Sequence, residues 1–343
     1  MIRFLCLFTV AVLCTSPCIS AAGLEPTEWR SQKHVAPEIP PIDAVSRGVS
    51  DAISTLQAKG VAIDTNKARR AAIQAVLSSF DPQARVLSTE EAVENGNVGN
   101  SAVLKSIGAV EKWPVKVSYV KFRSLYPAQG PEAAAELRSS TNGGMIGMII
   151  DLRGVGGRGF DSVQSLAGVF VGEDRDIFRV LDLRGSELAR YKSGAGPRIG
   201  IPVVVLVDTG TCDAAELLAA VARGGEEVLL VGQSTRGDTF VREKVVLGGG
   251  DVIYAGTRTV EASIGEKYWP GGLKPDVSVP VTHDAAPVKA TNAVASVPVV
   301  VEARDEAAQM DELVKRTKGD AVLQRAADIL MGLRTLNARE LRL

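Results

Sequence analysis

The sequence predicts an α/β fold, because segments with strand-like and helix-like apolar patterns alternate through its middle. The clearest strand covers residues 202–207, a continuous apolar run that is typical of a strand buried on both faces. A short polar turn at residues 208–213 follows it and leads into a helical pattern that ends at two glycines. A buried strand that runs through a tight turn into a helix N-terminus is an arrangement that can build a functional site.

The composition is that of a globular protein. The 343 residues are 45% hydrophobic with a mean hydropathy of +0.11, which is enough for more than one domain with its own core. The formal charge of -1 comes from 39 basic and 40 acidic residues. Since there is no net field to attract polyanions, we expect no nucleic-acid binding.

The N-terminus predicts a cleaved signal peptide over residues 1–22. A basic residue, Arg3, precedes an apolar run at residues 4–13, and small or polar residues lead to the expected cleavage after Ala22, with Ser20 as the alternative site. The apolar run is shorter than the roughly 20 residues that a membrane-spanning helix needs. We therefore expect a bacterial protein that is periplasmic or secreted, without stable membrane insertion.

Cysteine and histidine are too sparse for a disulfide framework or a metal centre. Cleavage of the signal peptide would leave Cys212 as the single cysteine of the mature chain. The two histidines, His34 and His283, have no neighbours at the spacing of a metal site. We expect no metal, no cofactor and no Ser-His-Asp triad.

The element order is expected as follows. Two helices, at residues 42–59 and 66–80, form an N-terminal helical domain over residues 23–95, and a linker covers residues 96–114. An α/β core spans residues 115–280, a second linker residues 281–303, and C-terminal helices residues 304–343. Within the core, strands are expected at residues 115–122, 145–152, 202–207, 227–231, 239–247 and 252–260, and helices at residues 131–139, 160–171 and 214–223.

Several motifs of the core resemble those of a known family. Residues 150–157 read IDLRGVGG and resemble the loop IDLRxNPGG, while residues 204–216 resemble VVLVNxGSASASE, which carries a nucleophile at a helix start. Residues 231–235 resemble the start of VGxxTFGKG, and residues 272–276 resemble GIxPD. These motifs belong to the C-terminal processing (tail-specific) peptidases, which are serine endopeptidases. The resemblance implies a ClpP/crotonase-like core with an N-terminal helical domain and C-terminal helices.

The chain departs from the family pattern in two ways. Between Glu91 and Trp113 there is no room for the family's PDZ domain, a module of roughly ninety residues. The resemblance also places the family's nucleophilic serine on Asp213 and its general-base lysine on Asp238. A serine-lysine dyad needs a hydroxyl that attacks and an amine that accepts its proton, and neither residue type is present. We therefore predict a catalytically inactive relative, a pseudopeptidase.

Each candidate site residue has a structural interpretation beside the functional one. Asp213 and Glu216 have the spacing of a capping box, and Asp238 lies at a turn where its side chain can bind backbone amides. Cys212 is a displaced nucleophile or a small buried side chain. The amides of Gly156 and Gly157 could bind a carbonyl or carboxylate oxygen, as an oxyanion site does.

Beside these residues, the motif pair Asp151 and Arg153 predicts a structural ion pair, and Arg236 and Arg242 are candidate partners of Asp238.

Three functions remain open from the sequence. The first is a binding or scaffold component of the cell envelope that recognises a peptide or protein, with strand addition as the mode. The second is an active serine-type or cysteine-type endopeptidase that uses Cys212, and the third is a non-peptidase enzyme with Asp213 and Asp238 as an acid/base pair. A homo-oligomer, or a hetero-oligomer with an active relative, is a further expectation.

Overall fold

The computed structural model describes residues 42–88, 91–92, 105–263, 271–280 and 306–340. The chain divides into two compact units, residues 1–65 and 66–343. Helix α1 (Ile42–Ala58) belongs to the first unit, and it matches the helix that the sequence predicts there. The predicted signal peptide and the linker at residues 281–303 lie outside the described residues.

The second unit is built on a six-stranded sheet with the order β11-β8-β7-β4-β3-β2. Its pairs are parallel except for β2, which runs antiparallel to β3. The strands are β2 (Ile107–Lys112), β3 (Val117–Phe122), β4 (Gly147–Asp151), β7 (Val203–Val207), β8 (Val228–Gly232) and β11 (Val277–Ser278).

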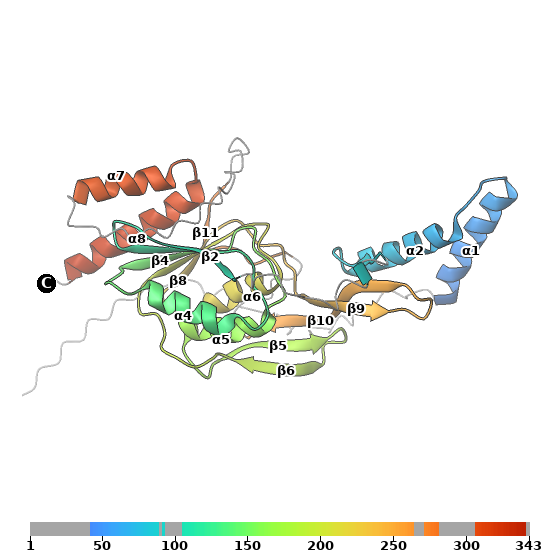
Figure 1. Ribbon diagram of the computed structural model, residues 1–343, viewed down its shortest axis with the longest axis horizontal. Coiled ribbons are helices and arrows are strands. Elements are labelled where there is room, and N and C mark those ends of the chain that lie inside the picture. The colour runs from blue at the N-terminus through green and yellow to red at the C-terminus, as the bar shows by residue number, and fades with distance from the viewer. Residues whose placement is uncertain (1–41, 89–90, 93–104, 264–270, 281–305, 341–343) are drawn as a thin grey trace, which may run out of the picture. The chain divides into compact units, whose positions relative to one another are not determined.

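Helices cover both faces of this sheet (Figure 1). The helices α4 (Gly130–Ser140), α5 (Phe160–Val171) and α6 (Asp213–Ala222) pack on one face, whereas α7 (Glu306–Thr317) and α8 (Ala321–Glu340) belong to the cluster on the other. Alternate strand residues enter opposite clusters: Val205 faces α4–α6, and its neighbours Val204 and Leu206 face α8. Burial on both faces explains why β7 is apolar throughout.

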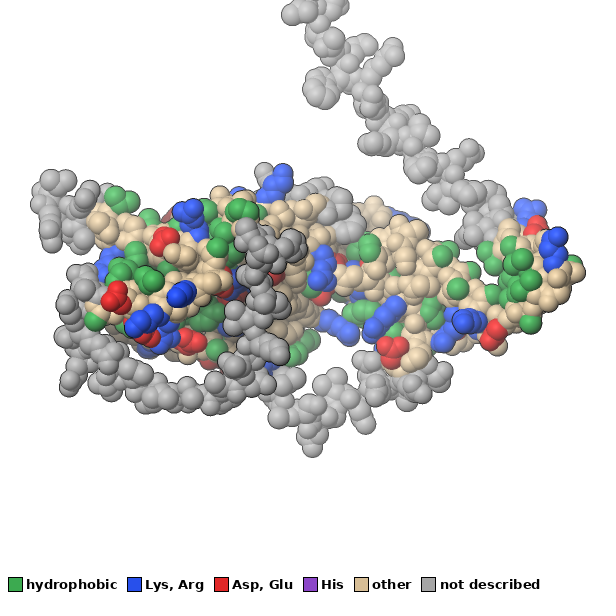
Figure 2. Space-filling view, turned by 90° about the horizontal axis from the view of Figure 1, so that it is seen from above, with side chains coloured by type: hydrophobic (Ala, Val, Ile, Leu, Met, Phe, Trp, Pro, Cys, Tyr) green, Lys and Arg blue, Asp and Glu red, His purple; other side chains and the backbone are tan. Residues whose placement is uncertain are grey.

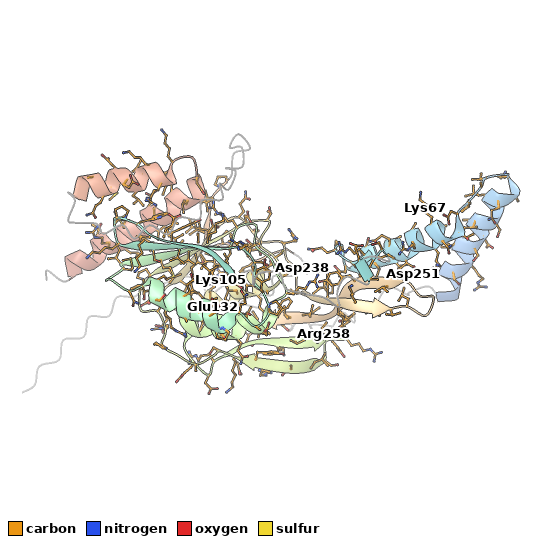
Figure 3. The ribbon with its side chains drawn as sticks, viewed as in Figure 1. Lys67, Lys105, Glu132, Asp238, Asp251 and Arg258 are labelled. Atoms are coloured by element: carbon orange, nitrogen blue, oxygen red, sulfur yellow. The ribbon has the colours of Figure 1, made fainter. Side chains whose placement is uncertain are left out.

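A second sheet has the order β1-β10-β5-β6, with β9 also paired to β10. Its strands are β1 (Arg85–Val86), β5 (Asp176–Asp182), β6 (Glu187–Lys192), β9 (Phe240–Val246) and β10 (Val252–Ala262). Helix α2 (Thr65–Phe80) packs on the β9–β10 hairpin through a small apolar cluster that includes Leu77 and Ile253. Asp251, labelled in Figure 3, also pairs with Arg69 of α2 at 3.0 Å.

Most predicted elements of the core are present within one to two residues of their predicted ends. Two regions differ. Residues 107–112, which the sequence places in a linker, form strand β2 and extend the sheet beyond β3. The β5–β6 hairpin is not predicted at all. In addition, α2 groups with the second unit, because it packs on β9 and β10.

On the face that Figure 2 shows, basic and acidic side chains are interspersed, so neither sign of charge dominates that surface. Among the described residues, no helix is both long enough and apolar enough to cross a membrane.

Candidate active site

The turn between β7 and α6 is tied to the loop that follows β4. Oδ1 of Asp208 accepts hydrogen bonds from the amides of Gly154 (2.8 Å) and Gly210 (2.9 Å), so one carboxylate joins both segments. Oγ1 of Thr211 donates to the carbonyl of Leu152 at 2.9 Å. Because β4 and β7 are parallel neighbours, their carboxyl ends meet at one edge of the sheet, and this is where the predicted site residues gather.

The predicted capping box at Asp213 is wrong. Cys212 is the N-cap of α6 and makes no side-chain capping bond, while Asp213 is the first helical residue and has a left-handed backbone with φ 52°. Its side chain therefore turns toward Arg242 rather than toward the first amides of the helix. The carboxylate of Glu216 accepts hydrogen bonds from Thr235 and from the amides of Gly237 (2.7 Å) and Asp238 (2.8 Å). Glu216 thus anchors the loop that carries Asp238.

Arg242 binds three aspartates at once. Its Nε and Nη2 contact Asp81 at 2.9 and 2.7 Å, its Nη2 and Nη1 each contact Asp238 at 2.9 Å, and its Nη1 contacts Asp213 at 3.2 Å. All three nitrogens of the guanidinium therefore contact carboxylate oxygens. The side chain of Arg242 is only 5% exposed. We call Arg242 and these three aspartates the Arg242 cluster.

Asp81 is the member of this cluster that sequence analysis missed as a site residue. It follows α2, is fully buried, and also accepts a hydrogen bond from the amide of Gly256 at 2.9 Å. The sequence offers one signal, since residues 80–88 read FDPQARVLS and resemble the family segment LDPHSxYLxPEE, in which Asp81 matches the aspartate. Nothing in that motif links Asp81 to Arg242, which lies 161 residues away.

Asp238 has the structural contacts that its position predicts. Its Oδ1 accepts from the amide of Phe240, two residues on, at 3.2 Å, and its Oδ2 accepts from Nε2 of Gln83 at 2.6 Å. Of the two candidate partners, Arg242 is the one that the structure brings to Asp238 (labelled in Figure 3). The predicted bond to a nearby backbone amide is confirmed.

Burial and charge act differently on the members of the Arg242 cluster. For Asp81, burial favours the neutral form, but the hydrogen bonds from Arg242 and Gly256 outweigh it, so the pKa of Asp81 lies below its ordinary value. For Asp213, burial and the charge of Asp238 raise the pKa above its ordinary value. Asp213 is also the aspartate of the cluster that reaches solvent, with 24% of its side chain exposed.

Cys212 is a poor nucleophile in this setting. Burial, together with the negative charge of Asp213, raises the pKa of the thiol to about 12. The residue is 7% exposed, and its Sγ lies 3.6 Å from Oδ2 of Asp213. Since the thiolate is the reactive form, this environment suppresses the chemistry that a displaced nucleophile would need. His283, a histidine that could act as the base for such a thiol, lies outside the described residues.

The glycine loop at residues 154–157 packs against the turn between β7 and α6. A Cβ atom on Gly156 would lie 2.8 Å from Sγ of Cys212 and 3.3 Å from Oδ2 of Asp213. Gly157 has φ 131°, and its backbone is hydrogen-bonded to Asp213, which partly offsets the rise in the pKa of that carboxyl. The structure therefore brings together all five predicted site residues. The carboxylate of Asp213 is thus bound to the backbone of Gly157, one of the two glycines whose amides the sequence offers as a site for a ligand oxygen.

The comparisons with known proteins agree with this arrangement. Residues 116–279, which contain the sheet except for β2, the glycine loop and both aspartate positions, match the model for peptidase family S41. The core of the chain is therefore an S41-type domain. It is 27% identical over 173 residues to the chloroplastic C-terminal processing peptidase of Tetradesmus obliquus, a match that covers 50% of this chain and 36% of that protein.

A second relative is the carboxy-terminal processing protease CtpA of Bacillus subtilis (strain 168). The two are 26% identical over 161 residues, which is 47% of this chain and 34% of CtpA. The matched region is thus about a third of the length of these relatives. A solved structure from Parabacteroides merdae ATCC 43184 shares the fold over 83% of this chain and 88% of its own, with a TM-score of 0.55 and 15% identity.

The S41 motif arginine has a structural role beside the site. Arg153 binds Asp151 through two nitrogens, at 2.9 and 2.8 Å, which confirms the predicted ion pair, and it reaches Asp320 at the start of α8 at 2.8 Å. Tyr119 donates to Asp151 at 2.8 Å. This buried network fixes the beginning of the glycine loop relative to the C-terminal helices. The described residues contain no group of three or more ligands that could hold a metal ion.

Proposed function

We propose that this chain is a non-catalytic member of family S41 that binds a peptide or protein ligand at the surface around the glycine loop. The observation that carries the proposal is that a single guanidinium, Arg242, binds both Asp213 and Asp238. These are the positions at which the family resemblance expects the nucleophile and its base.

Neither aspartate is suited to replace the serine-lysine pair. If the Asp213 carboxylate attacked an amide, the acyl-enzyme formed would be an anhydride. Expulsion of the amine in that step would also need a proton donor. Asp238 is not placed to supply that proton, because both of its oxygens already accept hydrogen bonds, from Gln83, Phe240 and Arg242. The same contacts argue against an acid/base pair in a non-peptidase enzyme, since both carboxylates are held by one permanent cation.

A peptide or protein ligand follows from the family, whose members act on polypeptides. Strand addition needs a free sheet edge, and β2 ends the path of the six-stranded sheet as the structure describes it. Residues Gly108 to Val110 on β2 are exposed and uncharged, and the charged side chains of this strand, Glu111 and Lys112, are its last two residues. The outer strand β6 carries Glu187, Arg190 and Lys192, which is the kind of charged edge that resists pairing. We therefore assign strand addition to β2.

Export to the periplasm or the medium is part of the same proposal. It rests on the basic, apolar and small-residue pattern of residues 1–22. Processing at Ala22 or Ser20 can be read from the N-terminus of the protein recovered from cell fractions. A chain that keeps residues 1–22 would contradict export by a cleaved signal.

The decisive experiment is a cleavage assay on an unfolded protein substrate, with mass spectrometry of new termini. We expect no cleavage by the natural chain or by Cys212→Ala. The double variant Asp213→Ser/Asp238→Lys restores the side chains that the family chemistry needs, and Asp174→Ser/Asp176→Lys, at the start of β5, serves as its matched control.

Activity in the first double variant alone would support an otherwise intact peptidase framework. New termini produced by the natural chain would refute the proposal, and their loss in Cys212→Ala would identify the thiol as nucleophile.

A further inference from the structure

Two exposed arginines flank the turn that carries Asp213. Arg158 directly follows the glycine loop, and Arg236 lies on the loop before β9, where its amide donates to the carbonyl of Thr211 at 3.0 Å. We infer that Arg158 and Arg236 form a binding site for a carboxylate of the peptide ligand. This inference rests on the proposed function and names the chemistry that the same surface recognises.

The guanidinium of Arg158 lies over an aromatic ring and donates no hydrogen bond to any residue that the structure describes. Its guanidinium carbon lies 4.6 Å from the centre of the Tyr254 ring, as expected for a cation over an aromatic face. Tyr254 is half-buried on β10 and is paired in register with Arg85 of β1, whose guanidinium lies 5.9 Å from the same ring. A guanidinium that rests on a ring by its face keeps its N–H groups directed outward at its edge. That edge is the part that binds a carboxylate with two parallel hydrogen bonds.

Arg236 brings a second positive charge to the other side of the turn. Its backbone is fixed by Thr211, one residue before Cys212, and its charge acts on the Cys212 thiol. Its side chain is exposed. Among the residues that the structure describes, neither Arg158 nor Arg236 has a carboxylate within 4.0 Å, whereas Arg85 lies 3.6 Å from Glu91. A ligand carboxylate that binds Arg158 or Arg236 therefore need not displace an ion pair with a described residue.

The buried acids below this surface have contacts of their own and form no ion pair with Arg158 or Arg236. Asp81 and Asp238 are bound to Arg242, and Glu216 accepts three hydrogen bonds from the loop at residues 235–238. These three carboxylates are at most 3% exposed. Solvent at the turn thus meets Arg158, Arg236 and the partly exposed edge of Asp213. Asp213 already binds Arg242 and the Gly157 backbone, so it does not compete fully for the outer arginines.

The carboxylate could come from the C-terminus of a peptide or from an Asp or Glu side chain, and the experiment separates the two. The full chain is immobilised and exposed to two random octapeptide libraries, one with free C-termini and one with amidated C-termini. Retained peptides are identified by mass spectrometry. The test variants are Arg158→Gln and Arg236→Gln. The control is Arg184→Gln, which removes an equally exposed arginine from the β5–β6 turn.

We expect retained peptides to be enriched in a carboxylate at one position, with about a tenfold loss of retention in each test variant and no loss in the control, since a hydrogen bond between charged groups typically contributes about a factor of ten. Enrichment only in the free-acid library identifies the C-terminus, and enrichment in Asp or Glu in both libraries identifies a side chain.

Two outcomes overturn the inference, and they differ in what they say about the proposed function. Retention without carboxylate enrichment, or equal losses in Arg184→Gln, would show that peptides bind but that Arg158 and Arg236 do not select them. Retention of no peptide from either library would overturn the inference and the peptide-binding proposal together. Cleavage of bound peptides would leave the carboxylate site standing while refuting the absence of catalysis.

Discussion

Nη1 of Arg242 lies 3.2 Å from Oδ1 of Asp213, so the residue at the expected nucleophile position is an ion-pair partner. The pairing links the first turn of α6 to strand β9. Through the other contacts of Arg242, it also links both to Asp81, beyond the end of α2. The region in which the family resemblance places catalysis is therefore joined by a buried charge cluster that connects α6, β9 and the end of α2.

Replacement of Arg242 by methionine should cost about 3–5 kcal/mol in the free energy of unfolding, because it leaves three buried or partly buried carboxylates without their cation. Arg258→Met is the matched control. Arg258, labelled in Figure 3, pairs with Glu243 at 3.1 Å with both side chains more than 40% exposed. Its loss should cost no more than about 1 kcal/mol. Urea unfolding measures both. Equal changes in the free energy of unfolding for the two variants would mean that the Arg242 cluster contributes no more to stability than an exposed ion pair does.

Asp213→Asn should raise stability at neutral pH. Burial and the charge of Asp238 raise the pKa of Asp213 in the folded state, so the folded protein binds its proton more tightly than the unfolded chain does. Stability is therefore lost as the pH rises from the unfolded value of about 4 through the raised folded value. The asparagine side chain of Asp213→Asn does not ionise, so the variant avoids this cost. The difference in stability between the variant and the natural chain should therefore disappear as the pH falls through the same window.

Asp182→Asn provides the control with the opposite sign. Its exposed carboxylate accepts hydrogen bonds from the amides of Ser186 (2.7 Å) and Arg184 (2.9 Å), and the Ser186 bond is the main reason that its pKa is lowered. The ionised Asp182 carboxylate therefore stabilises the folded protein above the unfolded pKa of aspartate, and this stabilisation is lost as the pH falls. Thermal unfolding between pH 3 and 8, values chosen to span these transitions, compares the variants. Parallel pH profiles for the two would contradict the assignment for Asp213.

Cys212 should react slowly with iodoacetamide in the folded protein. At a pKa of about 12 the thiolate fraction at pH 8 is about a thousandfold below that of an ordinary cysteine with a pKa near 8.5, and burial slows access further. Peptide mapping of Cys212 with and without urea gives the two rates. Rapid labelling of the native chain would revive the thiol as a nucleophile.

Much of the fold could be predicted because its signals are local. The apolar run of β7 indicates a strand covered on both faces, and the helix at Phe160–Val171 has the same bounds in the sequence analysis and in the structure. The resemblance to family motifs also identified Asp213, Asp238 and the glycine loop as the candidate site. The β5–β6 hairpin was missed, since β6 is largely exposed and its charged side chains obscure the apolar pattern.

The Arg242 cluster could not be predicted, because it depends on tertiary placement. Asp81 and Arg242 are brought together by the packing of α2 on β9 and β10, and no local pattern encodes that contact. The capping box failed for a different reason. The spacing of Asp213 and Glu216 is correct, but α6 begins one residue early, and the left-handed backbone at Asp213 directs its side chain toward Arg242.

Two glycines of the same loop should respond differently to alanine. Gly157 has φ 131°, and a Cβ there would lie 2.3 Å from the carbonyl oxygen of Leu125, so the loop would have to move away from the turn. Gly154 has φ 67°, and a Cβ there would meet nothing within 4 Å. We expect Gly157→Ala to cost about 3 kcal/mol or more, from strain and overlap together, and Gly154→Ala about 1 kcal/mol from its backbone alone.

Chemical denaturation of the two variants tests this difference, and binding of a peptide retained from the libraries tests its consequence. Because the Gly157 backbone contacts Asp213 and Arg158 is the next residue, displacement of this part of the loop should weaken binding in Gly157→Ala. Gly154→Ala should bind as the natural chain does, since the space around its added methyl group is open. Equal stability of the two variants would mean that the loop adapts freely, and that its amides and Arg158 are not held in place by the fold.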